Sequence, residues 1–208
     1  ETDGDRVFLG IPTRGSVNGM EPPGAVFEFR RHASGWSYVR RVRPTVSQAG
    51  ERFGSSMSIS GSRLVVGADG WVNGDGVPGR VLVFDAPLSG DPIQIEEIHS
   101  PDGSTESALS SASGAVGESL VLFRGARTSV YRATIEGSYG VTQRLPDDLG
   151  LALGRQRFGK GVGVSRTDIV VGVRGNENLG RIEVRRQDGS DTGESIARID
   201  DPWAQPFL

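Results

Sequence analysis

The chain has 208 residues, including 31 glycines and no cysteine, and its formal net charge at neutral pH is −3. The absence of cysteine excludes disulfide bonds, thiolate metal sites and a cysteine nucleophile, and the lack of a basic excess argues against a nucleic-acid partner. No apolar run approaches the roughly 18 residues of a transmembrane helix, so no membrane span is expected, whereas frequent glycine between short apolar runs indicates many turns and short strands.

The first predicted unit, residues 1–52, contains three runs that alternate apolar and polar residues, as half-buried strands do. These runs are residues 7–12, 24–29 and 36–42. A long loop, residues 13–23, separates the first two. The strand that opens the later units has no counterpart here, and we expect it to lie before residue 1.

The second predicted unit, residues 53–108, contains all four strands. They are residues 53–60, 63–68, 79–84 and 93–98. The second and third of these strands are again separated by a long loop, residues 69–78. The loop is rich in glycine, which favours a turn at that point.

The third and fourth units are predicted at residues 109–157 and 158–208. Strand-like runs in the third are residues 109–116, 118–123, 128–131 and 140–145, and in the fourth residues 158–165, 168–173, 180–185 and 195–199. The third unit keeps the apolar pattern but lacks the Phe-Gly pair that opens the second and fourth. Phe207 stands about where the next pair would begin.

The repeat is carried by Phe53-Gly54 and Phe158-Gly159, each followed at the same distance by a strand that ends in Val-Gly. The two pairs lie 105 positions apart, which is two periods of about 52 residues. Four short strands in each unit of this length are typical of a propeller blade, and such units must stack because none can bury its faces alone. We therefore predict an all-β fold, a β-propeller segment of four-stranded antiparallel blades over residues 1–208. A β-sandwich is the alternative, although the fixed spacing argues against it.

These motifs resemble the FG-GAP repeat, a family known from integrin α-subunits and from many bacterial secreted and surface proteins. Phe53-Gly54 with Val66-Gly67-Ala68 stands for the name-giving pair, and Leu9-Gly10-Ile11-Pro12 for the Gly-Ala-Pro of another copy. The resemblance implies a propeller that acts in adhesion or protein recognition outside the cell. Since four units are fewer than such rings usually have, we expect either a fragment completed by further blades or chains, or an unusual four-bladed ring.

Metal binding is the main departure from the family. Many members hold Ca²⁺ in an Asp-x-Asp-x-Asp-Gly loop between the first two strands of a blade, where several oxygen ligands surround the ion. Here the corresponding turns, residues 60–62 and 165–167, have no carboxylate cluster. We expect no Ca²⁺ there and no cofactor. Asp69 and Asp75, in the loop after the second strand of the second unit, are the one pair that could share a cation.

The loops 13–23 and 69–78 lie where the resemblance places ligand binding, and as parts of adjacent blades they are expected side by side. An exposed aromatic residue among polar groups is a common binding anchor, and Trp71 fits that description. The predicted site for a protein or glycan ligand consists of Arg14, Asn18, Asp69, Trp71, Asn73 and Asp75. The alternative is that Trp71 packs on its neighbours.

No catalytic constellation is evident. The two histidines, His32 and His99, each stand alone, and neither a Gly-x-Ser-x-Gly motif nor a phosphate-binding loop occurs. The pairs Arg30-Arg31 and Arg40-Arg41 are expected to form a solvated outer edge. We therefore predict a non-enzymatic binding or adhesion scaffold, extracellular or at the cell surface. The alternative function is a structural repeat segment that assembles with further blades and binds no small ligand.

Overall fold

The computed structural model describes residues 2–13, 20–76, 78–99, 109–116, 119–124, 127–133, 139–145, 157–165, 167–174, 180–186 and 195–200. Within these ranges the chain forms sixteen β-strands and no helix, as the short alternating runs predict. No helix of the described ranges is long and apolar enough to cross a membrane.

The strands form four antiparallel sheets, each of four strands in chain order, and we number the sheets 1 to 4 along the chain. Sheet 1 contains β1 (Thr2–Asp3), β2 (Arg6–Ile11), β3 (Ala25–His32) and β4 (Gly35–Val42). Sheet 2 contains β5 (Phe53–Ser60), β6 (Arg63–Val72), β7 (Pro78–Asp85) and β8 (Ile93–Ile98). Sheet 3 contains β9 (Leu109–Val116), β10 (Ser119–Arg124), β11 (Arg127–Ala133) and β12 (Tyr139–Leu145). Sheet 4 contains β13 (Arg157–Val164), β14 (Asp168–Arg174), β15 (Gly180–Arg186) and β16 (Ser195–Asp200).

Two details differ from the strands predicted from the sequence. A two-residue strand, β1, takes the first place in sheet 1, where no strand was expected. In addition, β6 continues through Val72 and pairs there with Pro78, so the predicted loop 69–78 is shorter and begins at residue 73. Sequence patterns missed this extension because glycine and aspartate, which disfavour strands, interrupt it at residues 69 and 70.

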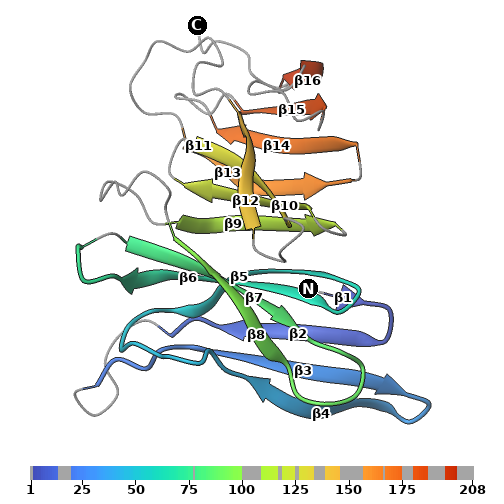
Figure 1. Ribbon diagram of the computed structural model, residues 1–208. Helices are drawn as coiled ribbons and strands as arrows, with labels where there is room; N and C mark the ends of the chain where they lie inside the picture. The colour runs from blue at the N-terminus through green and yellow to red at the C-terminus, as the bar shows by residue number, and fades with distance from the viewer. Residues whose placement is uncertain are drawn as a thin grey trace, which may run out of the picture.

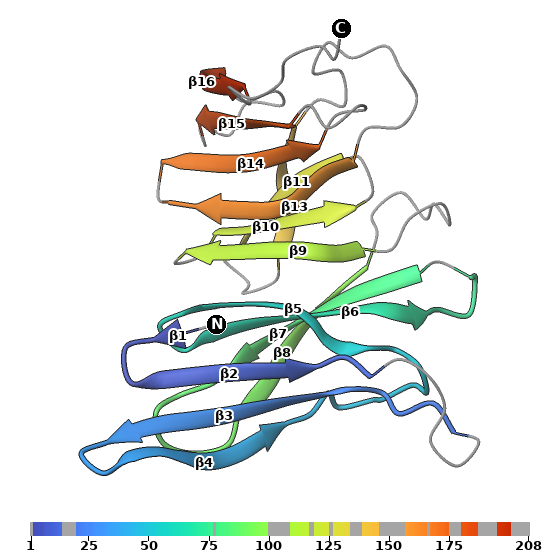
Figure 2. The ribbon, with the colours of Figure 1, turned by 180° about the vertical axis from the view of Figure 1, so that it is seen from behind.

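The sheets follow one another through the molecule, with sheet 1 and sheet 4 at opposite ends (Figures 1 and 2). The first strands of neighbouring sheets lie against each other, since β5 contacts β9 and β9 contacts β13. Sheet 2 is therefore covered on both faces, by sheet 1 on one side and by β9 on the other. This explains why Val81, Leu82, Val83 and Phe84 form a continuous apolar run that is buried throughout.

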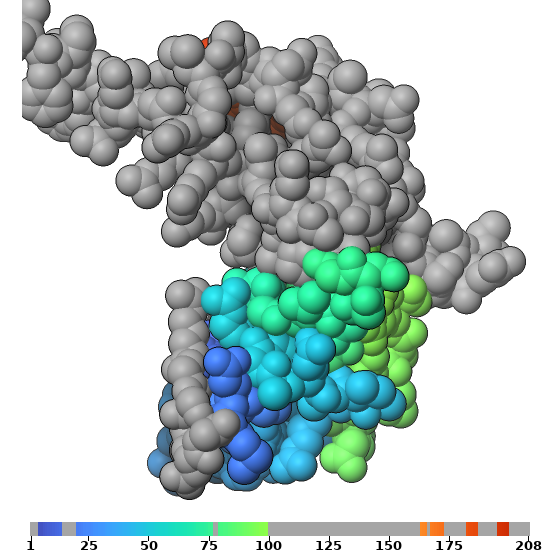
Figure 3. All heavy atoms as spheres, turned by 90° about the vertical axis from the view of Figure 1, so that its left-hand side faces the viewer, coloured from blue at the N-terminus to red at the C-terminus, as the bar shows by residue number. Residues whose placement is uncertain are grey.

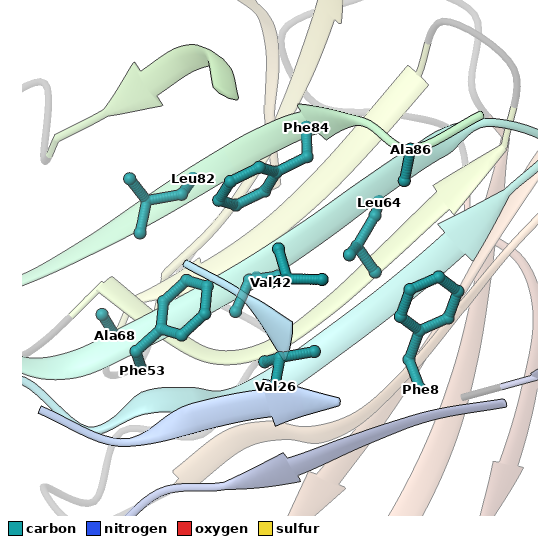
Figure 4. Close-up of a cluster of buried hydrophobic side chains, with 10 residues drawn as sticks. Phe8, Val26, Val42, Phe53, Leu64, Ala68, Leu82, Phe84 and Ala86 are labelled. Carbon is teal, nitrogen blue, oxygen red and sulfur yellow. The ribbon is translucent and has the colours of Figure 1, made fainter. Parts of the chain in front are cut away.

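A hydrophobic core fills the space between sheets 1 and 2 (Figure 4). Its members from sheet 1 are Phe8, Val26 and Val42, and those from sheet 2 and its next loop are Phe53, Leu64, Val66, Ala68, Leu82, Phe84 and Ala86. The rings of Phe53 and Phe84 meet edge to face, with centroids 6.0 Å apart, an arrangement that aromatic pairs favour. Figure 3 shows the first two sheets packed together as one continuous body.

Candidate functional site

The predicted ligand site lies at one end of β6. Asp69 and Trp71 are on the last part of that strand, and Asn73 and Asp75 are in the turn that follows. The remaining predicted site residues, Arg14 and Asn18, lie outside the described residues. The described end of the loop 13–23 lies near this strand. The carbonyl of Glu21 accepts a hydrogen bond from the backbone N–H of Gly50, and the next residue, Glu51, accepts one from the N–H of Gly70 on β6.

Trp71 packs into the protein. Its ring centroid lies 4.9 Å from that of His99, and the guanidinium carbon of Arg80 lies 5.1 Å from the ring centroid. The side chain is partly buried against the hydrophobic core between the first two sheets. A cation–π contact of this kind stabilises by about 1–2 kcal/mol when it is partly desolvated, so Trp71 holds the end of β6 in place.

Two of the described polar residues of the predicted site have partners within the protein. The carboxylate of Asp69 pairs with Arg52 at 3.0 Å, while the side-chain oxygen of Asn73 accepts a hydrogen bond from the backbone N–H of Asp75 at 2.9 Å. The Asn73 contact shapes the turn and leaves Asp75 exposed. Within the described residues, no group of three or more histidine and acidic side chains is arranged to hold a metal ion.

The hairpin between β6 and β7 is fixed by Gln48, which lies in the connection between β4 and β5. The side-chain amide of Gln48 donates to the carbonyl of Val72 at 3.1 Å, and its side-chain oxygen accepts from the backbone N–H of Val72 at 2.9 Å. This double hydrogen bond continues the sheet with a side chain in place of a strand. The turn that carries Asp75 is therefore held on a rigid base.

Beneath Trp71 lies a buried ion-pair network that sequence reasoning missed. The Arg80 guanidinium donates to Glu51 and to the carbonyl of Val46, both at 2.5 Å, and to Glu97 at 3.0 Å. Burial raises the pKa of the Glu51 carboxyl above its usual value of 4.5, although the neighbouring Arg80 acts in the opposite direction. A Gly-Arg pair stands at or next to the start of the third strand in both sheet 2 and sheet 4. This repetition was the one sequence signal that pointed to a structural role for Arg80.

The junction between sheets 1 and 2 depends on glycines of the repeated motifs. A Cβ atom built on Gly10 would lie 2.2 Å from the carbonyl oxygen of Gly54, and one built on Gly24 would lie 2.4 Å from that of Phe53. Gly54 itself has a φ of +92°, a conformation that side-chain-bearing residues rarely adopt. The N–H of Phe53 also donates to the carbonyl of Pro23 at 2.6 Å. The Phe-Gly and Gly-x-Pro motifs thus let two backbones meet.

One known protein family has a model that matches the segment around this junction. Residues 36–84 fit the family model described as the FG-GAP repeat. The chain carries an FG-GAP repeat. The matched segment runs from β4 to β7 and includes the Phe53-Gly54 junction, which confirms the resemblance seen in the motifs. No curated protein matches the chain.

A second buried charge cluster ties sheet 2 to sheet 1. Glu28 is fully buried on β3, and Arg30 and Arg40 donate to its two carboxylate oxygens at 3.0 and 2.6 Å, with Arg6 at 3.7 Å. Arg40 also donates to the carbonyls of Pro87, at 2.9 Å, and Gly90 in the loop between β7 and β8.

The prediction that both arginine pairs form a solvated outer edge is therefore wrong for Arg30 and Arg40. Strand alternation turns them toward the buried carboxylate of Glu28, while Arg31 pairs with Asp5 at 2.6 Å near the surface. A charge run in the sequence could not reveal this, because the attracting carboxylate lies inside an apolar strand.

The face of sheet 1 that points away from sheet 2 is open and carries a row of apolar side chains. Its apolar residues are Val7, Leu9, Ile11, Phe27, Phe29, Trp36 and Tyr38, and we call this surface the head face. Arg31 and Arg41 lie on the same side, opposite Trp36 and Phe27 respectively. Strand register places these residues on one side, because Leu9 pairs with Phe27 and Phe29 with Tyr38. Leu9 and Ile11 are each 50% exposed, and Trp36 and Tyr38 are exposed to a similar degree.

Proposed function

We propose that the chain is a non-enzymatic scaffold of the β-propeller type that works by packing its head face against a further β-sheet, outside the cell. The observation that carries the proposal is the exposure of this face. Four large hydrophobic side chains stand half exposed on one small sheet, and contiguous apolar patches of this kind mark protein interaction sites. Burying the exposed half of each would contribute on the order of 1 kcal/mol.

The shape of the face supports a sheet as its partner. The ring of Tyr38 contacts both Phe27 and Phe29, with centroid distances of 6.2 and 5.9 Å, so the three rings form one row of neighbouring aromatic side chains. The opposite face of the same sheet already packs on sheet 2 through an apolar core. A second sheet on the head face would repeat that mode of packing.

The proposal is tested by sedimentation of the full chain over a range of concentrations. We expect the wild-type chain to associate and Leu9→Lys, which places a charge in the middle of the head face, to weaken the association. Leu88→Lys is the matched control, because Leu88 is 66% exposed in the loop between β7 and β8 and is not on the head face. A wild-type chain that stays a single copy at every concentration, unchanged by Leu9→Lys, would refute the proposal.

A second candidate function is recognition of a protein or glycan at the turn after β6. It is favoured by the rigidity of that turn, because Gln48 and Trp71 hold its base while Asp75 remains exposed. A pre-ordered loop loses little conformational entropy on binding, and this raises affinity.

Binding of a glycan array by the wild-type chain and by Asp75→Ala tests the second candidate. Loss of a signal in the variant, with an unchanged melting temperature, supports it. An array without signal for either protein removes glycans from consideration as ligands of this turn.

A further inference from the structure

Leu9, which is exposed on the head face, has buried counterparts in sheets 2 and 4. Leu9 directly precedes a glycine, Gly10, in the second strand of its sheet. Val66 in sheet 2 and Val171 in sheet 4 precede a glycine at the equivalent position. Val66 and Val171 are 0% and 1% exposed, whereas Leu9 is 50% exposed. Sheet 1 therefore leaves open the face that the later sheets turn toward their preceding neighbour.

Sheet 4 leaves open the opposite face. We call this the tail face and define it by Val170, Ile182, Val184 and Ile199, which strand register places on one side. Ile182 is 43% exposed, while its counterparts two residues after the same glycine, Val26 and Val81, are 0% exposed.

The same comparison holds on the neighbouring strand. Val170 is 37% exposed, and its counterparts two residues before the strand glycine, Phe8 in sheet 1 and Val65 in sheet 2, are fully buried. The tail face is thus equivalent to the faces that sheets 1 and 2 turn toward the sheet that follows each of them.

Where side chains on both sides of a junction are described, a face of the tail type packs on one of the head type. At the junction of sheets 1 and 2, Phe8 and Val26 lie against Leu64, Val66, Leu82 and Phe84, the positions equivalent to the tail and head faces respectively. The two open faces are therefore complementary in the same way as the two faces that meet at this junction. Sheets 1 and 4 lie at opposite ends of the molecule (Figures 1 and 2), so one copy does not bring its own tail face onto its head face.

We infer that the occupant of the head face is the tail face of a second copy of this chain. The inference rests on the proposed function and names its partner. A head-to-tail contact between copies closes into a ring or continues as a filament. Two copies would contribute four sheets each, and the resulting eight lie within the usual range of about 4–8 blades in a propeller. We therefore expect a closed dimer.

The test is the mass of the full chain in solution, measured by light scattering for the wild type, Leu9→Lys and Ile182→Lys. We expect the wild type at twice the mass of one copy, and each variant at the mass of one copy, with a dimer dissociation constant raised at least about tenfold. Tyr38→Lys is a second head-face variant, and Leu88→Lys is expected to remain a dimer. Circular dichroism and a thermal melt verify that each variant is folded.

Mixing the two variants gives the decisive result. Leu9→Lys retains an intact tail face and Ile182→Lys an intact head face, so an equimolar mixture should regain the dimer mass through one intact contact. A dimer that Leu9→Lys disrupts and Ile182→Lys does not is a symmetric head-to-head contact. That outcome overturns the inference and leaves the proposed function standing. A wild-type chain at the mass of one copy overturns both.

Discussion

Replacing Gly54 by alanine examines the close backbone contact on which the junction of sheets 1 and 2 depends. The added Cβ would lie 2.9 Å from the carbonyl oxygen of Ala25 and 3.0 Å from a methyl group of Val26, both buried in sheet 1. Overpacking of this kind costs about 1–3 kcal/mol. The φ of +92° adds about 1–3 kcal/mol of backbone strain for a residue with a side chain. We expect Gly54→Ala to lower the free energy of unfolding by roughly 2–6 kcal/mol.

Two further variants separate the contributions. Gly61, in the turn between β5 and β6, has a φ of +58°, and its added Cβ would meet no atom within 4 Å. Gly61→Ala therefore carries strain alone and should cost no more than about 1–2 kcal/mol. Gly10 tests the steric contribution alone. A Cβ there would lie 2.2 Å from the carbonyl oxygen of Gly54, and Gly10 does not have a positive φ. Gly10→Ala should cost about 3 kcal/mol.

Urea unfolding followed by tryptophan fluorescence measures the three changes against the wild type. The expected order of stability places Gly61→Ala nearest to the wild type and both junction variants well below it. If Gly54→Ala and Gly61→Ala unfold at the same urea concentration, the backbones of sheets 1 and 2 do not meet at Gly54, and the structural role assigned to the Phe-Gly motif is refuted.

Three other predictions concern charges and the candidate ligand turn. Glu28→Gln leaves buried guanidinium groups without their carboxylate and should lower the unfolding free energy by about 3–5 kcal/mol in urea melts; an effect below about 1 kcal/mol would contradict the buried cluster. Because the pKa of Glu51 is raised above 4.5 in the folded state, its contribution to stability is fully present below that pH and is lost as pH rises through the raised value. Melts between pH 4 and 8 should thus show wild type losing stability relative to Glu51→Gln, and parallel pH profiles would argue against a raised pKa. Trp71→Ala should cost about 3–5 kcal/mol and Asp75→Ala less than about 0.5 kcal/mol by the same assay, since Trp71 packs and Asp75 does not; equal effects would contradict that difference.

The sequence determined the local elements because their signals are local. Alternation of apolar and polar residues gave the strands, and Ser60-Gly61-Ser62 gave a tight turn that the structure contains, with Gly61 at positive φ as a two-residue hairpin requires. The spacing from Phe-Gly to Val-Gly gave the repeat, and the antiparallel four-stranded sheets agree with it. Even the third unit, which lacks the signature residues, forms its sheet, because the apolar pattern is retained.

Tertiary structure decided which surfaces are exposed and which side chains have partners within the protein. The sequence predicts Trp71 as an exposed anchor in a glycine-rich loop. In the structure it contacts Arg80 on β7 and His99 just after β8, and both lie later in the chain. Arg40 reads as a surface charge, yet it joins Glu28 and the loop after β7. The same alternating pattern describes Leu9 and Val66, and only the presence or absence of a neighbouring sheet leaves the first exposed and the second buried. Burial depends on contacts between distant segments, and a local pattern does not contain them.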